Sequence, residues 1–178
     1  MKLLDFYPIS DYNIIRFRIK RGGQMKEVIP TQLTAFNKIH KEMDIVYHNY
    51  AKDFGLSDTA FWILYSVSEH NGSFTQRELC NDWSFTPQTV NSALKELEKR
   101  NIITLESVPG NRKNKWIKFT EQGKALAYRS VIPLMQAEYD SFAALNEEER
   151  ELLLSTTQKH ISILRNEINR INKMSSED

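Results

Sequence analysis

Two helix-start signals lie eleven positions apart near the middle of this chain, and their spacing limits the fold more than any other feature. The first is Thr75, which can cap a helix, with Glu78 three residues later to complete a capping box. The second is Thr86, which precedes Pro87, a residue favoured at the first position of a helix. The second helix is expected to end at Asn101, because asparagine tolerates the left-handed backbone of a helix end. Two short helices joined by so short a turn indicate a helix-turn-helix.

A basic β-hairpin is predicted directly after the second helix. Two runs of β-branched or alternating residues, 102–105 and 116–119, indicate its strands. The segment between them is expected to form a turn-rich tip that carries Arg112, Lys113 and Lys115. Lysine and arginine are almost never buried without a partner, so contacts with phosphate explain these cations better than packing does. The two motifs together predict a winged helix that binds double-stranded DNA.

Longer helices are predicted on both sides of these motifs. Apolar residues recur at spacings of three and four over residues 31–54, which indicates one amphipathic helix. Residues 58–69 are apolar on nearly every side, as in a central, buried helix. After the hairpin, Thr120 can cap a long helix in which Pro133 is expected to introduce a kink. The last helix is predicted to run from residue 146 to about residue 173, with acidic residues at the positive end of its dipole.

The last predicted helix carries an apolar seam that favours packing against another helix. In a protein of this size a long terminal helix more often forms a dimer interface than an internal contact. The residues assigned to this interface are Ile161, Leu164, Ile168 and Ile171. We therefore expect a homodimer.

The predicted fold is mainly α with a small β-wing, a winged helix-turn-helix with long N- and C-terminal dimerisation helices. Residues 56–120 are expected to form the winged helix-turn-helix, and residues 31–55 and 121–174 the helical dimerisation region. Residues 1–30 form an N-terminal extension, for which alternating apolar and basic residues leave open either a short hairpin or an arm.

Several fragments of the chain, taken in order, resemble MarR-type regulators, a family of homodimeric winged-helix transcription factors that are often repressors. The fragments are Thr75-Gln76-x-Glu78-Leu79, Thr86-Pro87-x-Thr89-Val90, Leu94-Lys95-x-Leu97-Glu98-Lys99, Asn111-Arg112-Lys113 and Phe119-Thr120-Glu121-x-Gly123. The ordered similarity covers roughly residues 31 to 174. The chain departs from the family in the wing, where Asn111 and Lys113 stand at positions that often hold Asp and Arg. It also departs at Ser92, where Arg is frequent, and at Asn101, where Gly is usual. These departures concern the DNA sequence that is recognised rather than the fold.

The residues expected to contact DNA lie on the two short helices and on the hairpin. At the start of the first helix, Thr75, Gln76 and Arg77 are expected to fix register on phosphate. On the second helix, the amides of Gln88 and Asn91 could pair with adenine edges, Thr89 could touch a thymine methyl group and Lys95 could anchor a phosphate. The full predicted set is Thr75, Gln76, Arg77, Thr86, Pro87, Gln88, Thr89, Asn91, Ser92, Lys95, Arg112, Lys113, Asn114 and Lys115. A dimer would place two such helices in successive major grooves, so the operator is expected to be a pseudo-palindrome with half-sites about 10 base pairs apart.

The resemblance also implies control by a small molecule. Members of the family often bind a phenolic or other aromatic ligand between the dimer frame and the winged helix, which implies a repressor that the ligand relieves. The aromatic candidates for such a pocket are Phe36, Tyr47, Tyr50, Trp62, Tyr65 and Trp83. For each of them, hydrophobic core is the favoured alternative.

Control by redox state and control by a metal ion are two less favoured alternatives. Cys80 would sense redox state only as an exposed thiolate with a low pKa, whereas a buried cysteine is an inert hydrophobic residue. His40, Asp44 and His48 recur at a spacing of four and could supply metal ligands. A polar flank beside the apolar stripe is the favoured interpretation, so we expect no metal ion.

Composition bounds the class of protein. Apolar residues make up 40% of the chain and charged residues 26%, which are values of globular proteins. The net charge is only +1, but residues 95–118 hold seven cations against three acids, and residues 138–151 hold six acids against one cation. A duplex interacts mainly with charges that lie within a screening length of about 8–10 Å, so the local positive charge matters more than the net charge.

The motifs of common enzymes are missing from the sequence. It contains no Gly-rich phosphate loop, His-Glu-x-x-His, Gly-x-Ser-x-Gly or Cys-x-x-Cys, so we expect neither an enzyme nor a cofactor. A single cysteine and the lack of a long apolar run predict a cytoplasmic protein without a membrane span. The remaining alternative is a winged helix that binds another protein and does not bind DNA sequence-specifically.

Overall fold

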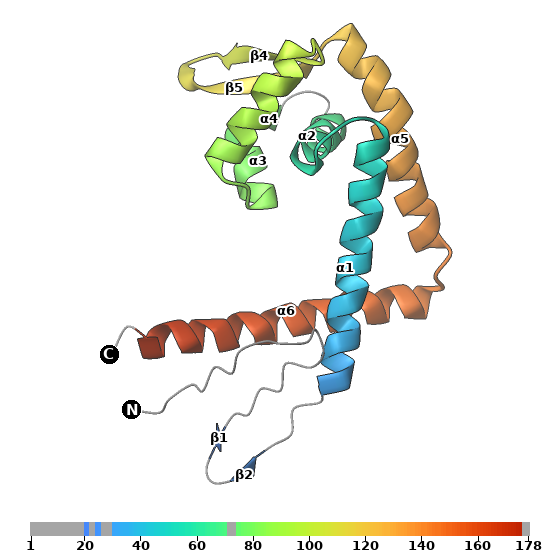
Figure 1. The fold of residues 1–178 in the computed structure, drawn as a ribbon, viewed down its shortest axis with the longest axis vertical. Coiled ribbons are helices and arrows are strands. Elements are labelled where there is room, and N and C mark those ends of the chain that lie inside the picture. The colour runs from blue at the N-terminus through green and yellow to red at the C-terminus, as the bar shows by residue number, and fades with distance from the viewer. Residues whose placement is uncertain (1–19, 22–23, 26–29, 71–73, 176–178) are drawn as a thin grey trace, which may run out of the picture. The chain divides into compact units, whose positions relative to one another are not determined.

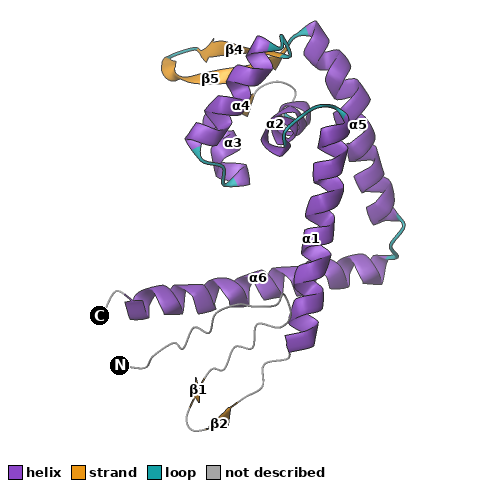
Figure 2. Cartoon of the chain, in the orientation of Figure 1, coloured by secondary structure: helices purple, strands orange, loops and turns teal. Residues whose placement is uncertain are grey.

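The computed structural model describes residues 20–21, 24–25, 30–70 and 74–175. The chain forms two compact units, residues 1–58 and residues 59–178. Figure 1 shows the course of the chain and Figure 2 its helices and strands. In the described residues no helix is long and apolar enough to cross a membrane.

The first unit contains a small hairpin and one long helix. The strands β1 (Lys20–Arg21) and β2 (Gln24–Met25) pair antiparallel, with Lys20 opposite Met25. Most of the residues that favoured a hairpin or an arm lie outside the described part of the chain. The helix α1 (Pro30–Asp53) matches the predicted helix to within one residue at each end.

The end of α1 shows why the chain stops being helical there. The Gly55 N–H donates to the Lys52 carbonyl at 2.9 Å, and the Leu56 N–H donates to the Ala51 carbonyl at 3.1 Å. This is a Schellman motif, and it requires the left-handed backbone that Gly55 adopts with φ +65°. Leu56 then turns inward and is buried.

The second unit is a winged helix followed by two long helices. The helices α2 (Asp58–Glu69), α3 (Gln76–Trp83) and α4 (Pro87–Lys99) precede the hairpin of β4 (Ile103–Val108) and β5 (Asn111–Phe119). The helices α5 (Glu121–Ala143) and α6 (Glu147–Ser175) complete the chain. Its core comes from α2, α3, α4, α5 and the strands, and the largest fully buried side chains include Phe61, Leu64, Leu79, Leu94, Leu97, Ile103, Ile117 and Val131.

The sheet differs from its prediction in two ways. A third strand, β3 (Phe74–Thr75), pairs antiparallel with β5, so the order is β3-β5-β4. The turn-rich tip expected over residues 106–115 is wrong, because β4 continues to Val108 and β5 begins at Asn111. Only Pro109 and Gly110 connect these strands, with Gly110 in a left-handed conformation at φ +75°. The basic run predicted for a loop therefore belongs to the strand β5.

Candidate nucleic-acid interface

The start of α3 is held by the capping box that the sequence predicts. The Thr75 hydroxyl accepts from the Glu78 N–H at 3.4 Å, and the Glu78 carboxylate accepts from the Thr75 N–H at 2.7 Å. Thr75 also pairs with Trp116 of β5, and it is buried. The cap therefore fixes the position of Gln76 and Arg77, the first residues of α3. Gln76 is half-buried and Arg77 is exposed.

The start of α4 is capped in a similar way. The Thr86 hydroxyl accepts from the Thr89 N–H at 3.1 Å and lies 2.8 Å from the Thr89 hydroxyl. Pro87 occupies the first position of the helix, where its missing N–H leaves no hydrogen bond unmade. The far end is a Schellman motif in which Asn101 adopts the left-handed backbone, with φ 53°. Both ends of α4 follow the sequence prediction.

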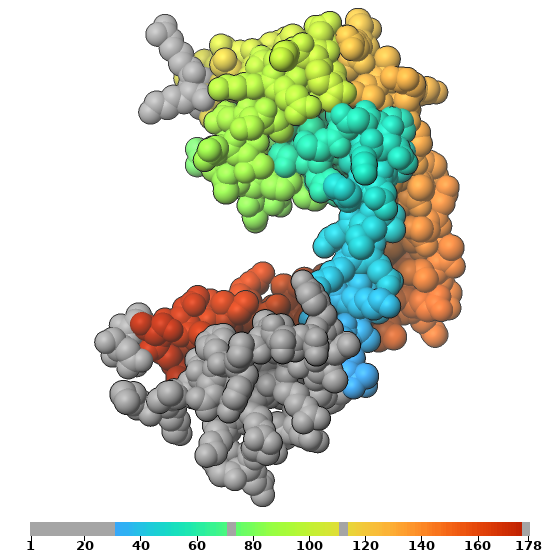
Figure 3. All heavy atoms as spheres, in the orientation of Figure 1, coloured from blue at the N-terminus to red at the C-terminus, as the bar shows by residue number. Residues whose placement is uncertain are grey.

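The helix α4 has one apolar face and one polar face. The buried residues are Val90, Ala93, Leu94 and Leu97. The exposed polar residues Gln88, Asn91, Ser92 and Lys95 repeat the same spacing two positions earlier. At 3.6 residues per turn, two positions correspond to a rotation of about 200°, so this polar stripe points away from the core. Atoms of α4, yellow-green in the space-filling view, lie at the surface of the molecule (Figure 3).

Two of the polar side chains on this face take part in hydrogen bonds within the protein. The Gln76 amide donates to the Asn91 side-chain oxygen at 2.9 Å, which joins the start of α3 to the exposed face of α4. The Ser92 hydroxyl donates to the Gln88 carbonyl of its own helix at 3.0 Å. Sequence reasoning placed Gln76 on phosphate and missed its bond to Asn91, because no local pattern relates two residues on different helices.

The strand β5 carries the cations expected of the wing. Lys115 is exposed and Asn114 is half-buried. The backbones of Arg112 and Lys113 lie in β5, whereas their side chains lie outside the described part of the structure. The Lys118 ammonium lies 5.3 Å from the centre of the Trp116 ring, a cation–π contact that the sequence analysis did not foresee. Trp116 and Lys118 are two positions apart in a strand, so their side chains lie on the same face of the sheet. That spacing was the signal in the sequence that could have predicted this contact.

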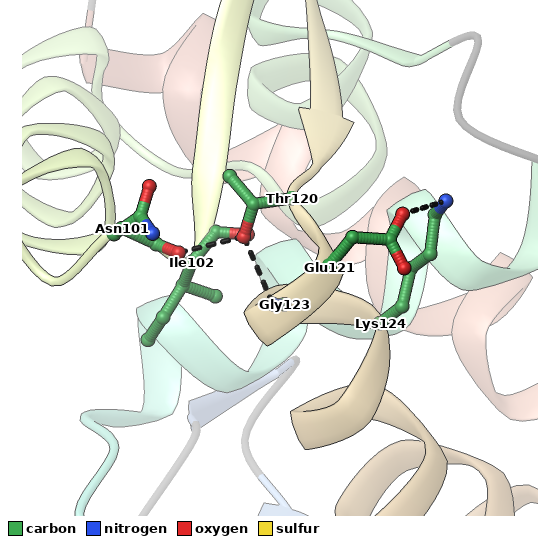
Figure 4. A network of polar contacts seen from close by, with 6 residues as sticks. All are labelled: Asn101, Ile102, Thr120, Glu121, Gly123 and Lys124. Atoms are coloured by element: carbon green, nitrogen blue, oxygen red, sulfur yellow. Dashed lines mark hydrogen bonds and ion pairs between the residues drawn. The ribbon is translucent and has the colours of Figure 1, made fainter.

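A network of hydrogen bonds joins α4, β4 and the start of α5 (Figure 4). The Thr120 hydroxyl donates to the Asn101 carbonyl at 2.6 Å and accepts from the Gly123 N–H at 3.0 Å. The Thr120 N–H donates to the Ile102 carbonyl at 3.1 Å. The predicted cap of α5 is therefore present, and it also fixes the end of the helix α4.

The six aromatic candidates for an effector pocket fall into the two units of the chain, three in each. In the second unit Trp62 stacks on Trp83 with ring centres 4.4 Å apart, and the Trp83 N–H donates to the Ser66 hydroxyl at 2.8 Å. The Tyr65 hydroxyl donates to the Glu138 carboxylate at 2.7 Å. These contacts place the three side chains in one packed cluster, and their part in an effector pocket stays a prediction.

The candidates of the first unit lie on α1. Phe36 meets the His40 ring at 4.4 Å between ring centres, and Tyr50 meets Phe54 at 5.2 Å. Tyr47 is half-buried. Burial raises the pKa of the Tyr50 hydroxyl above its ordinary value.

The residues considered for sensing are placed as follows. His48 makes a hydrogen bond to Asp58 at 2.9 Å. Within the ranges that the structure describes, no three His, Cys, Asp or Glu side chains are placed to hold a metal ion, so His40, Asp44 and His48 do not form such a cluster. Cys80 is a half-buried free thiol.

The predicted dimer-interface residues lie on α6, of which no residue is buried. The side chains of Ile161, Leu164, Ile168 and Ile171 are 47%, 49%, 47% and 58% exposed. The apolar face of α6 is therefore about half exposed.

Comparison with known proteins agrees with this geometry. The model of the MarR family matches residues 54–113, which contain the two short helices and most of the hairpin. The HTH-type transcriptional regulator SarZ of Staphylococcus aureus (strain MRSA252) is 30% identical over 111 residues, which span 62% of this chain and 72% of SarZ. The HTH-type transcriptional repressor NicR of Pseudomonas putida is 26% identical over 124 residues, which span 70% of this chain and 78% of NicR.

The fold also matches that of a solved structure. The S. aureus MepR–DNA complex superimposes with a TM-score of 0.61 at 22% identity, covering 75% of this chain and 97% of that one. This likeness confirms the predicted mainly α winged-helix fold, and the similarity to SarZ confirms the predicted family. The chain is a transcription regulator and not an enzyme. The protein belongs to the MarR family of DNA-binding transcription regulators.

Proposed function

We propose that this protein acts as a homodimer that binds a pseudo-palindromic operator, and that it is a repressor relieved by a small aromatic ligand. The observation that carries the proposal is the polar stripe of α4, whose residues Gln88, Asn91, Ser92 and Lys95 face away from the core. A helix with one apolar and one hydrogen-bonding face, fixed at both ends, is what reading of a major groove requires.

Phosphate contacts would come from the strand β5 and from the ends of the helices. Lys115 is exposed on β5, and Lys95 is exposed on α4. Phosphate contacts position a protein on the duplex, and base contacts select the sequence. We therefore assign Lys95, Lys115 and the predicted Arg112 and Lys113 to phosphate, and Gln88 and Asn91 to base edges.

The half-exposed apolar face of α6 supports the homodimer. Ile161, Leu164, Ile168 and Ile171 alternate at spacings of three and four along this helix. That alternation is the pattern of a helix that packs against another helix. A second copy of the chain would cover this face, and a twofold dimer calls for a twofold operator.

Repression and its relief are the finer part of the proposal. One relative, NicR, is described as a repressor. The aromatic cluster of the second unit, Trp62, Tyr65 and Trp83, would supply apolar walls for an aromatic effector. Such a ligand can release DNA only if it binds one arrangement of the two readers better than the other.

The test of DNA binding compares three lysine variants with a base-reading variant. Lys95→Ala and Lys115→Ala are expected to weaken binding to all duplexes alike, and each should reduce the slope of log affinity against log salt by about 1. Gln88→Ala is expected to change which sequence is selected from random duplexes. Lys159→Ala removes the same charge from α6 and serves as the matched control. An affinity that does not change with salt would instead support a protein-interaction module.

A further inference from the structure

We propose that Gln76 is a specificity-determining residue, because its hydrogen bond to Asn91 determines which group of the Asn91 amide faces the bases. The inference rests on the proposed function, in which the polar face of α4 enters the major groove. It assigns Gln76 a positioning role, in place of the phosphate contact expected from the sequence. It also changes the base that Asn91 is expected to read.

Both partners of this hydrogen bond are held by regular structure. Gln76 is the first residue of α3, directly after a cap that is paired with β5 and closed by Glu78. Asn91 lies on the exposed stripe of α4, one residue after the buried Val90. The Gln76 Nε2 donates to the Asn91 Oδ1 at 2.9 Å. Neither side chain is on a loop, so the pair is fixed before any DNA arrives.

The direction of this bond decides what Asn91 offers to a base. An asparagine amide has one acceptor oxygen and one donor NH2 group. A bidentate pair with adenine needs both, because Oδ1 accepts from N6 and Nδ2 donates to N7. The bond from Gln76 holds Oδ1 toward α3 and uses one of its two lone pairs. The group left fully available to the groove is the donor Nδ2.

A donor without an adjacent acceptor selects among the four bases. In the major groove guanine presents two acceptors, N7 and O6, and thymine presents one, O4, whereas adenine presents its N7 acceptor beside the N6 donor. Cytosine presents only the N4 donor there, which would face the Asn91 NH2 group unfavourably. Wild-type protein is therefore expected to prefer guanine, with thymine second, at the base beneath Asn91.

Replacing Gln76 with glutamate should reverse this preference. A carboxylate accepts but does not donate, so the Asn91 amide must turn its NH2 group toward Glu and its oxygen toward the groove. The Gln76→Glu variant is expected to select cytosine or adenine, whose N4 and N6 groups are donors. Asn91→Asp should select the same donors, because one of its oxygens accepts from Gln76 and the other faces the groove. Gln122→Glu adds the same charge at an exposed position of α5, outside the predicted DNA-contacting set, and controls for charge alone.

The experiment selects operators from random duplexes with wild-type protein and with the Asn91→Ala, Gln76→Ala, Gln76→Glu, Asn91→Asp and Gln122→Glu variants. Asn91→Ala identifies the base position that depends on Asn91. At that position wild type should favour guanine by about tenfold over cytosine, which lies within the range of a base-edge contact. Gln76→Ala should lose the preference against adenine, Gln76→Glu should invert the order, and Gln122→Glu should leave this position unchanged.

The possible outcomes separate this inference from the proposed function. If wild type selects an operator but Gln76→Ala and Gln76→Glu keep its base at the Asn91 position, or if Asn91→Ala changes no position, the inference is overturned and DNA reading stands. If wild type selects no sequence, both fail together. Circular dichroism confirms that each variant is folded, and Asn91→Asp carries the test should Gln76→Glu not fold.

Discussion

Replacement of Gly123 with alanine is expected to destabilise the protein, although the same change usually stabilises a helix. Gly123 is the third residue of α5 and is buried. At an ordinary helical position alanine is more favourable than glycine by roughly 0.5–1 kcal/mol. Here an added Cβ would lie far inside van der Waals distance of the Ile102 carbonyl oxygen, and 3.1 Å from Cδ1 of Phe119. The sign of the effect should therefore reverse.

The size of the effect follows from what must move. The carbonyl of Ile102 is backbone and cannot yield by changing rotamer, so the first turn of α5 has to shift away from it. The shift strains three hydrogen bonds: Gly123 N–H to the Thr120 hydroxyl at 3.0 Å, Thr120 N–H to the Ile102 carbonyl at 3.1 Å, and the Thr120 hydroxyl to the Asn101 carbonyl at 2.6 Å. At about 1 kcal/mol for each bond, less the alanine gain, the free energy of unfolding should fall by roughly 2 kcal/mol.

Urea unfolding followed by circular dichroism, at one fixed protein concentration, measures this loss. The matched control is Gln122→Ala, which alters the adjacent exposed position of α5 and should change the free energy of unfolding by less than about 0.5 kcal/mol. A Gly123→Ala protein that unfolds at the same urea concentration as wild type, or a higher one, would show that this junction is not tightly packed. The reasoning about Ile102 would then be wrong.

Two further predictions concern the dimer and the aromatic cluster. The double variant Ile161→Glu with Ile168→Glu should convert a dimer to monomers in sedimentation at micromolar concentration, because it places charges in the seam of α6; persistence of the dimer would remove α6 from the interface. Trp83→Phe should lower the free energy of unfolding by about 1–2 kcal/mol in urea, because the ring stacking survives while the hydrogen bond to the buried Ser66 hydroxyl is lost. An unchanged midpoint for Trp83→Phe would contradict that assignment.

The parts of the fold that the sequence predicted well are those set by local chemistry. The capping box of Thr75 with Glu78 and the cap of Thr86 each connect residues three positions apart, so the pattern of side chains was sufficient. The left-handed residue Asn101 was predicted for the same reason, since few residue types tolerate that backbone. Helix α1 was found from its apolar spacing alone.

The parts that were missed depend on pairing between distant segments. Strand β3 has only two residues, and it exists because Phe74 pairs with Ile117 and Thr75 with Trp116. Hairpin length likewise depends on register: Ser107 pairs with Lys115, and an irregularity follows before Val108 pairs with Asn111. The residue pattern of a strand does not identify the strand that it pairs with. The tip of the hairpin was therefore predicted too long.

In the candidate site, too, the features set by local sequence were predicted and the contacts between distant segments were not. Sequence periodicity identified the outward face of α4, because the buried residues and the polar residues each recur at helical spacing. It could not show that Thr89, Asn91 and Ser92 each have a hydrogen-bonding partner inside the protein. Groups held in this way lose little conformational freedom when a duplex binds, so they can discriminate between bases by direction. Adaptable contacts then fall to the long, exposed side chains of Gln88 and Lys95, which must lose rotamer freedom to bind. Base selection at Asn91 should therefore be sharper than at Gln88.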